Sequence, residues 1–144
     1  MMNLHLEIAR WIVAAVAVFN GGGFVADAII PATAKQHLHN PQWPPHAKFH
    51  NAQSMLLGIG LGILALAMLF GPGPLTLPRF TLATATAGLY FVTMLLTPLF
   101  PGTAWVDPEF EKETARPLGQ APQKLVSLII CMLLAAAWLL AFTA

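Results

Sequence analysis

Four apolar stretches, each long enough to cross a membrane as a helix, restrict the fold of this sequence more than any other feature. They cover residues 8–30, 50–70, 80–99 and 125–142. About 20 apolar residues in a helix span the hydrocarbon core of a bilayer. Strands are disfavoured because the stretches lack the polar–apolar alternation of a membrane barrel. The sequence therefore predicts an all-α, integral membrane four-helix bundle, with residues 1–144 as a single transmembrane domain.

The composition supports lipid as the surroundings of this chain. Hydrophobic residues make up 57% and charged residues 9%, whereas soluble domains average about 25% charged residues. The net charge of +1 gives no electrostatic case for a nucleic-acid partner. Cys131 is the single cysteine, which excludes an internal disulfide. The predicted partners are membrane lipid, a lipophilic small molecule and a possible second copy of the chain.

Proline and glycine divide the chain into helices and connections. Pro31 follows the first stretch, Pro44 and Pro45 precede the second, and Pro122 opens the fourth. The connection near residues 71–79 is short, whereas residues 32–49 and 102–123 are long. In an antiparallel bundle these two long loops emerge on the same side of the membrane. We therefore expect most of the polar chemistry at one end of the bundle.

The positive charges predict an orientation for this multi-pass protein. The long loops and adjoining helix ends hold Lys35, Lys48, Lys112, Arg116 and Lys124, and the opposite side holds Arg10 and Arg79. Cytoplasmic loops carry the excess of lysine and arginine. The long loops are therefore predicted to be cytoplasmic.

Each apolar stretch also carries polar residues at helical spacing, which places them on one face of each helix. Such faces should turn inward, away from lipid. Ordinary packing through small and hydroxylated residues is the alternative explanation, above all for the threonines and the serine. The expected substrate-binding residues are Asn20, Asn51, Gln53, Tyr90, Thr93, Thr97 and Ser127.

Asp27 lies about one turn inside the end of the first stretch, where a carboxylate costs about 2.5–3.5 kcal/mol. A cation, a metal, a hydrogen-bond network or protonation must offset that cost, unless the side chain reaches the interface. His46 and His50 form an H-x3-H pair near the start of the second stretch. We expect these three residues to meet and to be catalytic. His37 and His39 are expected to be solvated, with membership of a metal site as the less favoured alternative. The acidic run from Asp107 to Glu113 is expected to be a solvated, self-paired loop, with a lid or an extra carboxylate over the site as the alternative.

Asp27, His46 and His50 allow two kinds of chemistry and one role without chemistry. Two histidines and one carboxylate are the ligands of many non-haem iron sites and some zinc sites, so one divalent ion, iron or zinc, could bind Asp27, His46 and His50. Without metal, the histidines would transfer protons or polarise a substrate, because their unperturbed pKa lies near neutrality. Histidines that only hydrogen-bond the interface are the third interpretation.

The most distinctive segment reads WPPHAKFHNAQ over residues 43–53. This segment, within four short membrane helices, resembles a poorly characterised family of small bacterial and fungal membrane proteins. More loosely, the architecture resembles the DoxX-like and anthrone-oxygenase-like four-helix families. The resemblance supplies no catalytic residues, and it implies small-molecule chemistry in a membrane only at the level of fold.

These features lead to one functional hypothesis and its rivals. The hypothesis is a small membrane enzyme that acts on a lipophilic small molecule in an intramembrane pocket, by acid–base or metal-assisted chemistry. The rivals are a non-catalytic lipophile-binding protein, a proton-coupled transporter and an accessory membrane subunit. An unpaired inward Asp27 would favour proton coupling, and a pocket filled by side chains would favour the accessory role.

Overall fold

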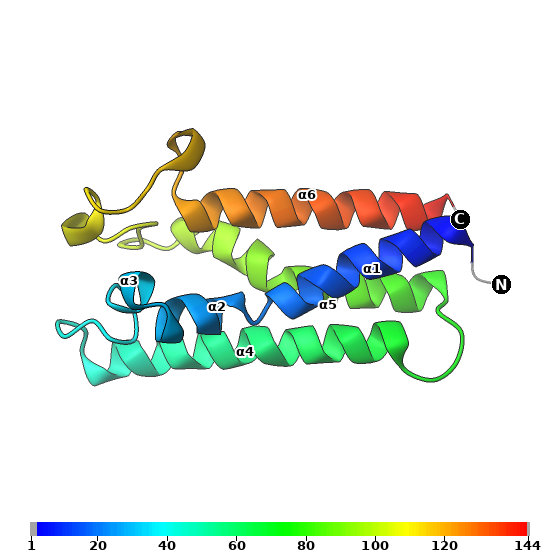
Figure 1. The fold of residues 1–144 in the computed structure, drawn as a ribbon, viewed down its shortest axis with the longest axis horizontal. Coiled ribbons are helices and arrows are strands. Elements are labelled where there is room, and N and C mark those ends of the chain that lie inside the picture. Colours follow the sequence, from blue (N-terminus) through cyan, green and yellow to red (C-terminus); the bar gives the residue numbers. More distant parts are fainter. Residues whose placement is uncertain (1–2, 144) are drawn as a thin grey trace.

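The computed structural model describes residues 3–143 and is an antiparallel bundle of four long helices (Figure 1). These are α1 (Leu4–Phe19), α4 (Pro45–Phe70), α5 (Leu77–Leu96) and α6 (Pro122–Phe142). The described residues contain no strand. Four segments are long and apolar enough to cross a membrane: Leu4–Ile29, Pro45–Phe70, Leu77–Leu99 and Pro122–Phe142. The fold predicted from the sequence is confirmed, with each helix starting a few residues earlier than expected.

The helices follow one another around the bundle, so α1 packs on α4 and α6, and α5 packs on α4 and α6. Small residues permit these contacts: Ala9 and Ala17 on α1, Ala83 and Ala87 on α5, and Ala137 on α6 are buried. A Cβ on Gly62 of α4 would collide with the backbone carbonyl of Ala17 on α1. Close backbone approach through small residues is the usual packing of membrane helices.

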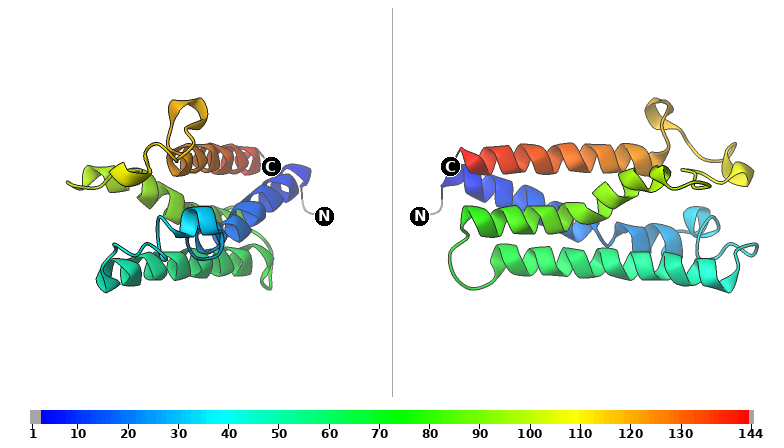
Figure 2. Two further views of the ribbon diagram at one scale, coloured as in Figure 1. Left: turned by 60° about the vertical axis from the view of Figure 1, so that its left-hand side comes forward. Right: turned by 180° about the vertical axis from the view of Figure 1, so that it is seen from behind.

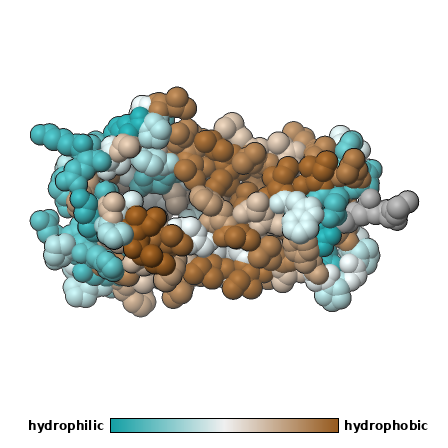
Figure 3. Space-filling model, viewed as in Figure 1, coloured by the Kyte–Doolittle hydropathy of each residue, from teal (hydrophilic) through white to brown (hydrophobic). Residues whose placement is uncertain are grey.

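Many large apolar side chains lie on the outside of the bundle, in addition to those buried in its core, such as Leu69, Phe80 and Phe91. Leu56, Leu57, Ile63, Met132 and Leu139 are among the exposed residues. On the face shown in Figure 3, hydrophobic residues cover the middle of the molecule and hydrophilic residues gather at its two ends. An exposed apolar surface of this extent fits lipid rather than water. The chain is thus built as a multi-pass membrane protein.

The first spanning segment is interrupted. After α1 the chain turns at Asn20 and Gly21 and continues as α2 (Gly22–Phe24) and the π-helix η1 (Val25–Ile29). The amide of Ile30 donates to the carbonyl of Val25, five residues earlier. Single π-helical turns within α-helices are frequent at functional sites. The short helix α3 (Pro31–Ala34) then carries the chain back toward the bundle.

The two long loops lie at the same end of the bundle, as predicted, and α1 begins and α6 ends at the other (Figures 1 and 2). Near the long loops α5 finishes in the 3-10 helix η2 (Thr97–Leu99). The third connection contains two more 3-10 turns, η3 (Pro108–Phe110) and η4 (Pro117–Gly119). We call the two ends the long-loop end and the short-loop end, the latter holding residues 71–76.

Candidate functional site

A cavity of about 540 Å³ lies at the long-loop end, between the η1 and α3 segment on one side and α5 and α6 on the other. Part of its lining is apolar and includes Phe19, Phe91, Met94 and Val126. The polar residues that line it are Asp27, Thr33, Lys35, Gln36, His37, Tyr90, Glu113, Thr114, Gln123 and Ser127. Mostly apolar cavities with a few placed polar groups are typical small-molecule sites.

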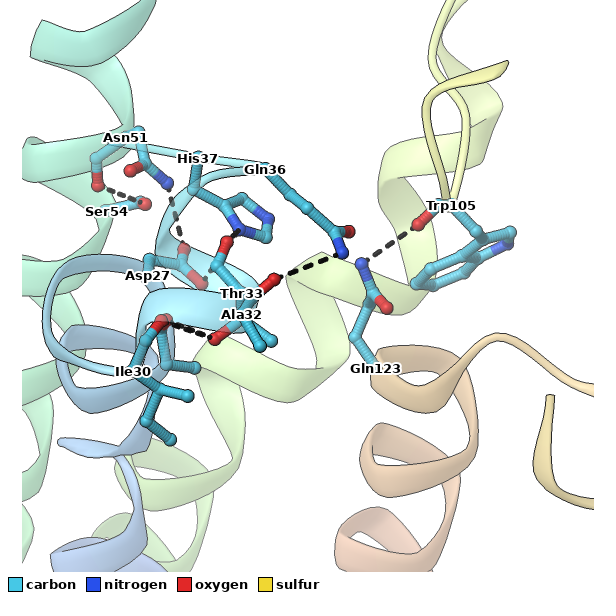
Figure 4. A network of polar contacts seen from close by, with 11 residues as sticks. Asp27, Ile30, Ala32, Thr33, Gln36, His37, Asn51, Ser54, Trp105 and Gln123 are labelled. Atoms are coloured by element: carbon cyan, nitrogen blue, oxygen red, sulfur yellow. Dashed lines mark hydrogen bonds and ion pairs between the residues drawn. The ribbon is translucent and has the colours of Figure 1, made fainter. Parts of the chain in front are cut away.

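Asp27 lies at the centre of the π-helix η1, and its side chain is 17% exposed. The Nδ2 of Asn51 on α4 donates to its Oδ2 at 2.9 Å, and the Nδ1 of His37 lies 3.4 Å from its Oδ1 (Figure 4). One carboxylate oxygen therefore accepts a hydrogen bond, and the other lies beside an imidazole nitrogen. From the sequence, some group had to offset the cost of burying this carboxylate. The side-chain amide of Asn51 and the imidazole of His37 are those groups.

His37 is held in place by the turn that follows α3. Its Nδ1 lies 2.9 Å from the backbone carbonyl of Thr33, and its ring meets Trp43 edge-on at 5.9 Å between centroids. Because a carbonyl oxygen can only accept, Nδ1 carries the proton in the neutral ring. Nε2 then keeps its lone pair, on the ring edge away from Thr33 (Figure 4). This tautomer makes Nε2 a proton acceptor.

Local sequence explains why the chain brings His37 back to Asp27. Pro31 occupies the first turn of α3, where a missing N–H is tolerated. The Thr33 hydroxyl donates to the carbonyl of Ala26 in η1 at 2.5 Å, which ties α3 to the π-helix. The amides of His37 and His39 both donate to the carbonyl of Ala34. These bonds wind the chain tightly beyond Pro31, so that residue 37 returns to residue 27.

Tyr90 and Ser127 line the opposite wall of the cavity, on α5 and α6. A Cβ on Gly23 would lie only 2.8 Å from the Tyr90 hydroxyl. The absence of a side chain at Gly23 therefore makes room for the phenol. The hydroxyl of Ser127 lies 3.2 Å from the sulfur of Met94. The sequence predicted both residues as substrate-binding; both line the cavity, and the binding role stays a prediction.

Two contacts join the third connection to its neighbours beside the cavity. The ammonium of Lys35 lies 2.5 Å from a carboxylate oxygen of Glu113, so residue 113 of the third connection meets residue 35 of the first. The side-chain amide of Gln123 donates to the carbonyl of Trp105 at 2.9 Å (Figure 4). Glu111 pairs with Arg116 within the third connection. The acidic run is thus partly solvated and self-paired, as expected, but Glu113 lines the cavity.

His46 and His50 do not join this site, which corrects the expected arrangement. Both are exposed, their Nε2 atoms lie 3.1 Å apart, and His50 Nδ1 lies 3.2 Å from Gln53 Oε1. In a helix, neighbouring residues project about 100° apart. The face of α4 that holds Asn51 turns toward Asp27, so the adjacent His50 points elsewhere.

The predicted iron or zinc site of Asp27, His46 and His50 is therefore not formed. No group of three or more His, Cys, Asp or Glu side chains within residues 3–143 could hold a metal ion. The four-residue spacing did place the two histidines side by side. It carried no information about which way that pair faces.

Five expected substrate-binding residues do not line the cavity. Asn20 is buried and donates to the carbonyl of Ala87 at 3.1 Å, so it joins α1 to α5. The hydroxyls of Thr93 and Thr97 are exposed and bond the carbonyls of their own helix. Gln53 is exposed beside His50. The packing alternative holds for Asn20, and Asn51 contacts Asp27 rather than the cavity.

Sequence reasoning missed His37, which was expected to be solvated. Two local signals were available: Pro31 as a helix start directly after the first span, and Thr33 as a hydroxyl able to bond backwards. Neither signal identifies residue 37 as the partner of Asp27. That pairing depends on the unusual π-helical end of the first span, which composition does not indicate.

Comparison with known proteins places the chain in a family. It belongs to the family of unknown function DUF6640, whose model matches residues 12–136. This agrees with the expected membership of a poorly characterised family, and it does not bear on the looser DoxX-like or anthrone-oxygenase-like resemblance. No curated protein and no solved structure matches the chain.

Proposed function

For this member of a family of unknown function, we propose a small membrane enzyme that moves protons on a lipophilic substrate held in the long-loop cavity. His37 acts as the acid and base through Nε2, and Asp27 orients its ring. Asn51 in turn fixes the Asp27 carboxylate. The observation that carries the proposal is the Asn51–Asp27–His37 chain of contacts at the wall of an apolar cavity.

The arrangement follows the logic of a histidine oriented by a third group. A carboxylate beside Nδ1 stabilises the imidazolium that forms when Nε2 takes a proton, without itself becoming protonated. The Thr33 carbonyl keeps Nδ1 as the donor. His37 can therefore accept a proton from one atom of the substrate and return one to another. Such a step needs no oxidant, reductant or metal.

The remainder of the cavity supports a lipophilic substrate. Phe, Met and Val side chains form part of its lining, and the helices around it are long and apolar enough to cross a membrane. Tyr90 supplies a phenol hydroxyl across from Asp27 and could hold a substrate oxygen. We place this cavity within the membrane, close to the interface on the long-loop side.

Two rival roles are less well supported by the same contacts. A proton-coupled role was expected to show an unpaired inward Asp27, but one oxygen of this carboxylate accepts a hydrogen bond from Asn51 and the other lies 3.4 Å from His37 Nδ1. An accessory role was expected to show a site filled by side chains, but the site is a cavity of about 540 Å³. Non-catalytic binding of a lipophile is the closest alternative, and proton exchange separates it from catalysis.

Proton exchange tests the proposal even while the substrate is unidentified. The purified protein in nanodiscs is incubated in D₂O with a total lipid extract of the expression host, and deuterium incorporation is followed by mass spectrometry. The wild-type protein should label at least one lipophile above the level in empty nanodiscs. His37→Ala should lower that labelling by about 100-fold, the scale of lost acid–base catalysis.

His46→Ala is the matched control, because it removes another histidine at the same end that lies outside the cavity. It should keep full exchange. Equal exchange by His37→Ala and wild type would overturn the role of His37. A lipophile that copurifies with the protein but never gains deuterium would replace the enzyme with a binding protein.

We also propose that the long-loop end is cytoplasmic, from the five-to-two distribution of lysine and arginine. A membrane-impermeant maleimide applied to intact cells tests it. Thr76→Cys at the short-loop end should be labelled, and Gln42→Cys at the long-loop end should be labelled only after lysis. The reverse pattern would invert the orientation.

A further inference from the structure

A second hollow lies on the outer surface of the bundle between α1 and α6, which run side by side (Figure 1). Its volume is about 480 Å³. We call it the α1–α6 groove. It is lined entirely by apolar residues: Ile12, Ala15, Val16, Phe19, Val126, Ile129, Ile130 and Leu133.

The α1–α6 groove adjoins the cavity. Phe19 and Val126 line both hollows, so one side chain from each helix forms the border between them. A molecule whose polar head contacts Asp27 and His37 can therefore extend past this border onto the membrane-facing surface. Entry from the bilayer through such a side opening would spare an apolar substrate from passing through water.

The dimensions of the α1–α6 groove fit a hydrocarbon chain. From Phe19 to Ile12 on α1 is seven residues, and so is Val126 to Leu133 on α6. At 1.5 Å per residue the groove is about 10 Å long, which accommodates roughly eight methylene groups. No polar side chain lines it, so nothing in it would favour a polar occupant over an alkyl chain.

The charged residues around the cavity indicate what kind of head group the substrate carries. Asp27 and Glu113 both line it, and the ammonium of Lys35 is already paired with Glu113. An anionic head would meet carboxylates without a free cation, whereas a hydroxyl or carbonyl could bond His37 or Tyr90.

We propose that the α1–α6 groove binds the tail of the substrate, which is a single-chain lipophile with an uncharged hydroxyl or carbonyl head. The head occupies the cavity and the tail lies between α1 and α6. The inference names the substrate class for the proposed enzyme and rests on that function only for the position of the head.

Dodecanol carrying a diazirine near its terminal carbon is the probe, with the protein in nanodiscs. Cross-links mapped by mass spectrometry should concentrate on the residues of the α1–α6 groove. Ala15→Trp fills the groove from α1 and Ile129→Trp narrows it from α6. Each should weaken dodecanol binding by about tenfold, the loss expected when a few methylenes lose their contacts. Binding of butanol, whose chain ends before the groove, should not change.

Ala136→Trp is the matched control, because Ala136 is also an exposed alanine on a spanning helix but lies outside the groove. It should leave dodecanol binding unchanged. Dodecanoate should bind more weakly than dodecanol. Cross-links spread evenly over all lipid-facing residues would mean ordinary surrounding lipid and would overturn the proposal. So would equal effects of the three tryptophan variants, or a change of oligomeric state in Ala15→Trp alone.

The outcome is distinguishable from failure of the enzyme proposal. His37→Ala should keep the cross-links in the groove while losing deuterium exchange. If His37→Ala loses deuterium exchange but the cross-links show no preference for the groove, the enzyme proposal stands and the tail site is ruled out. If the cross-links concentrate in the groove but the wild-type protein catalyses no exchange, the tail site stands and the enzyme proposal is ruled out.

Discussion

Polar side chains have different partners at the two ends of the bundle. At the short-loop end the Arg79 guanidinium donates to the carbonyls of Met68 at 2.6 Å and Pro72 at 2.8 Å, which closes the end of α4. Arg10 lies over the Phe70 ring, 4.1 Å from its centroid. At the long-loop end, Asp27 and His37 contact each other and also border a cavity.

This difference distinguishes polar side chains that stabilise the fold from polar side chains that are available to a ligand. Arg79 directs its donors to backbone carbonyls that would otherwise lack partners, as expected of a helix C-terminus. At the long-loop end, Asn40 Nδ2, Asn51 Oδ1 and Thr114 Oγ1 are buried without a hydrogen-bond partner among the described residues, whereas at the short-loop end Arg10 Nε is the one such atom. Buried polar groups without partners reduce stability. A polar side chain that caps a helix directs its donors to backbone carbonyls. A polar side chain that binds a ligand keeps hydrogen-bonding atoms directed away from the backbone and toward a cavity.

The largest expected effect is at the long-loop end. Asp27→Asn keeps the size of the side chain but removes the charge that stabilises a protonated His37. Deuterium exchange should fall by about 100-fold, while the thermal unfolding midpoint in nanodiscs changes little. A variant that retains exchange would show that Asp27 serves the fold, as Arg79 does.

The packing of α4 against α1 runs between the two ends of the bundle. Alanine substitutions at two glycines of α4 should change the free energy of unfolding in opposite directions. Gly62→Ala should lower the free energy of unfolding by about 1–3 kcal/mol, since its Cβ would meet the Ala17 carbonyl. Gly60→Ala, whose Cβ would meet nothing within 4 Å, should raise it by about 0.5–1 kcal/mol. Reversible unfolding in mixed micelles measures both. Equal signs would contradict the packing described for this face.

At the short-loop end, Arg79→Met should cost about 1–1.5 kcal/mol of unfolding free energy, because the carbonyls at the end of α4 lose their donor. Deuterium exchange should be unaffected. The same unfolding measurement and the exchange assay, run in parallel, check the two halves of this prediction. A loss of exchange would show that the two ends are coupled.

The smallest expected effect is on the ion pair beside the cavity. Lys35 and Glu113 have side chains that are 51% and 57% exposed. Exposed pairs contribute about 0–1 kcal/mol, so Lys35→Met should lower the unfolding free energy by less than about 1 kcal/mol. Dodecanoate binding is the sharper readout: removing the cation should weaken it further relative to dodecanol. Unchanged selectivity would argue that these charges do not select the head.

Much of the fold could be predicted from the sequence because lipid imposes simple requirements. A spanning helix must be apolar and of a certain length, and proline and glycine mark its ends. The placement of the two long loops at one end followed directly. The break at Asn20 and the π-helix around Asp27 did not, since the residues from Gly21 to Ile29 remain apolar apart from Asp27 and suit several helical geometries.

The candidate site was predicted only in part. Asp27, Tyr90 and Ser127 were expected to turn inward, as polar residues within a span do, and all three line the cavity, while their roles stay predictions. His46 and His50 were placed on the wrong side. In water the apolar face of a helix is the buried one, but on α4 both the packed face, with Met55 and Leu69, and the lipid face, with Leu56 and Leu57, are apolar. Hydrophobic spacing therefore gave little guide to its rotation.

The amino-acid sequence by itself determined that this chain has four membrane-crossing helices, that its polar loops share one end, and that a buried carboxylate at position 27 requires partners. Only the tertiary structure decided what those partners are. The rotation of α4 brought Asn51 rather than His50 to Asp27, and the turn after Pro31 brought His37. Spacing along a helix fixes which residues share a face, whereas packing against the other helices fixes where that face points.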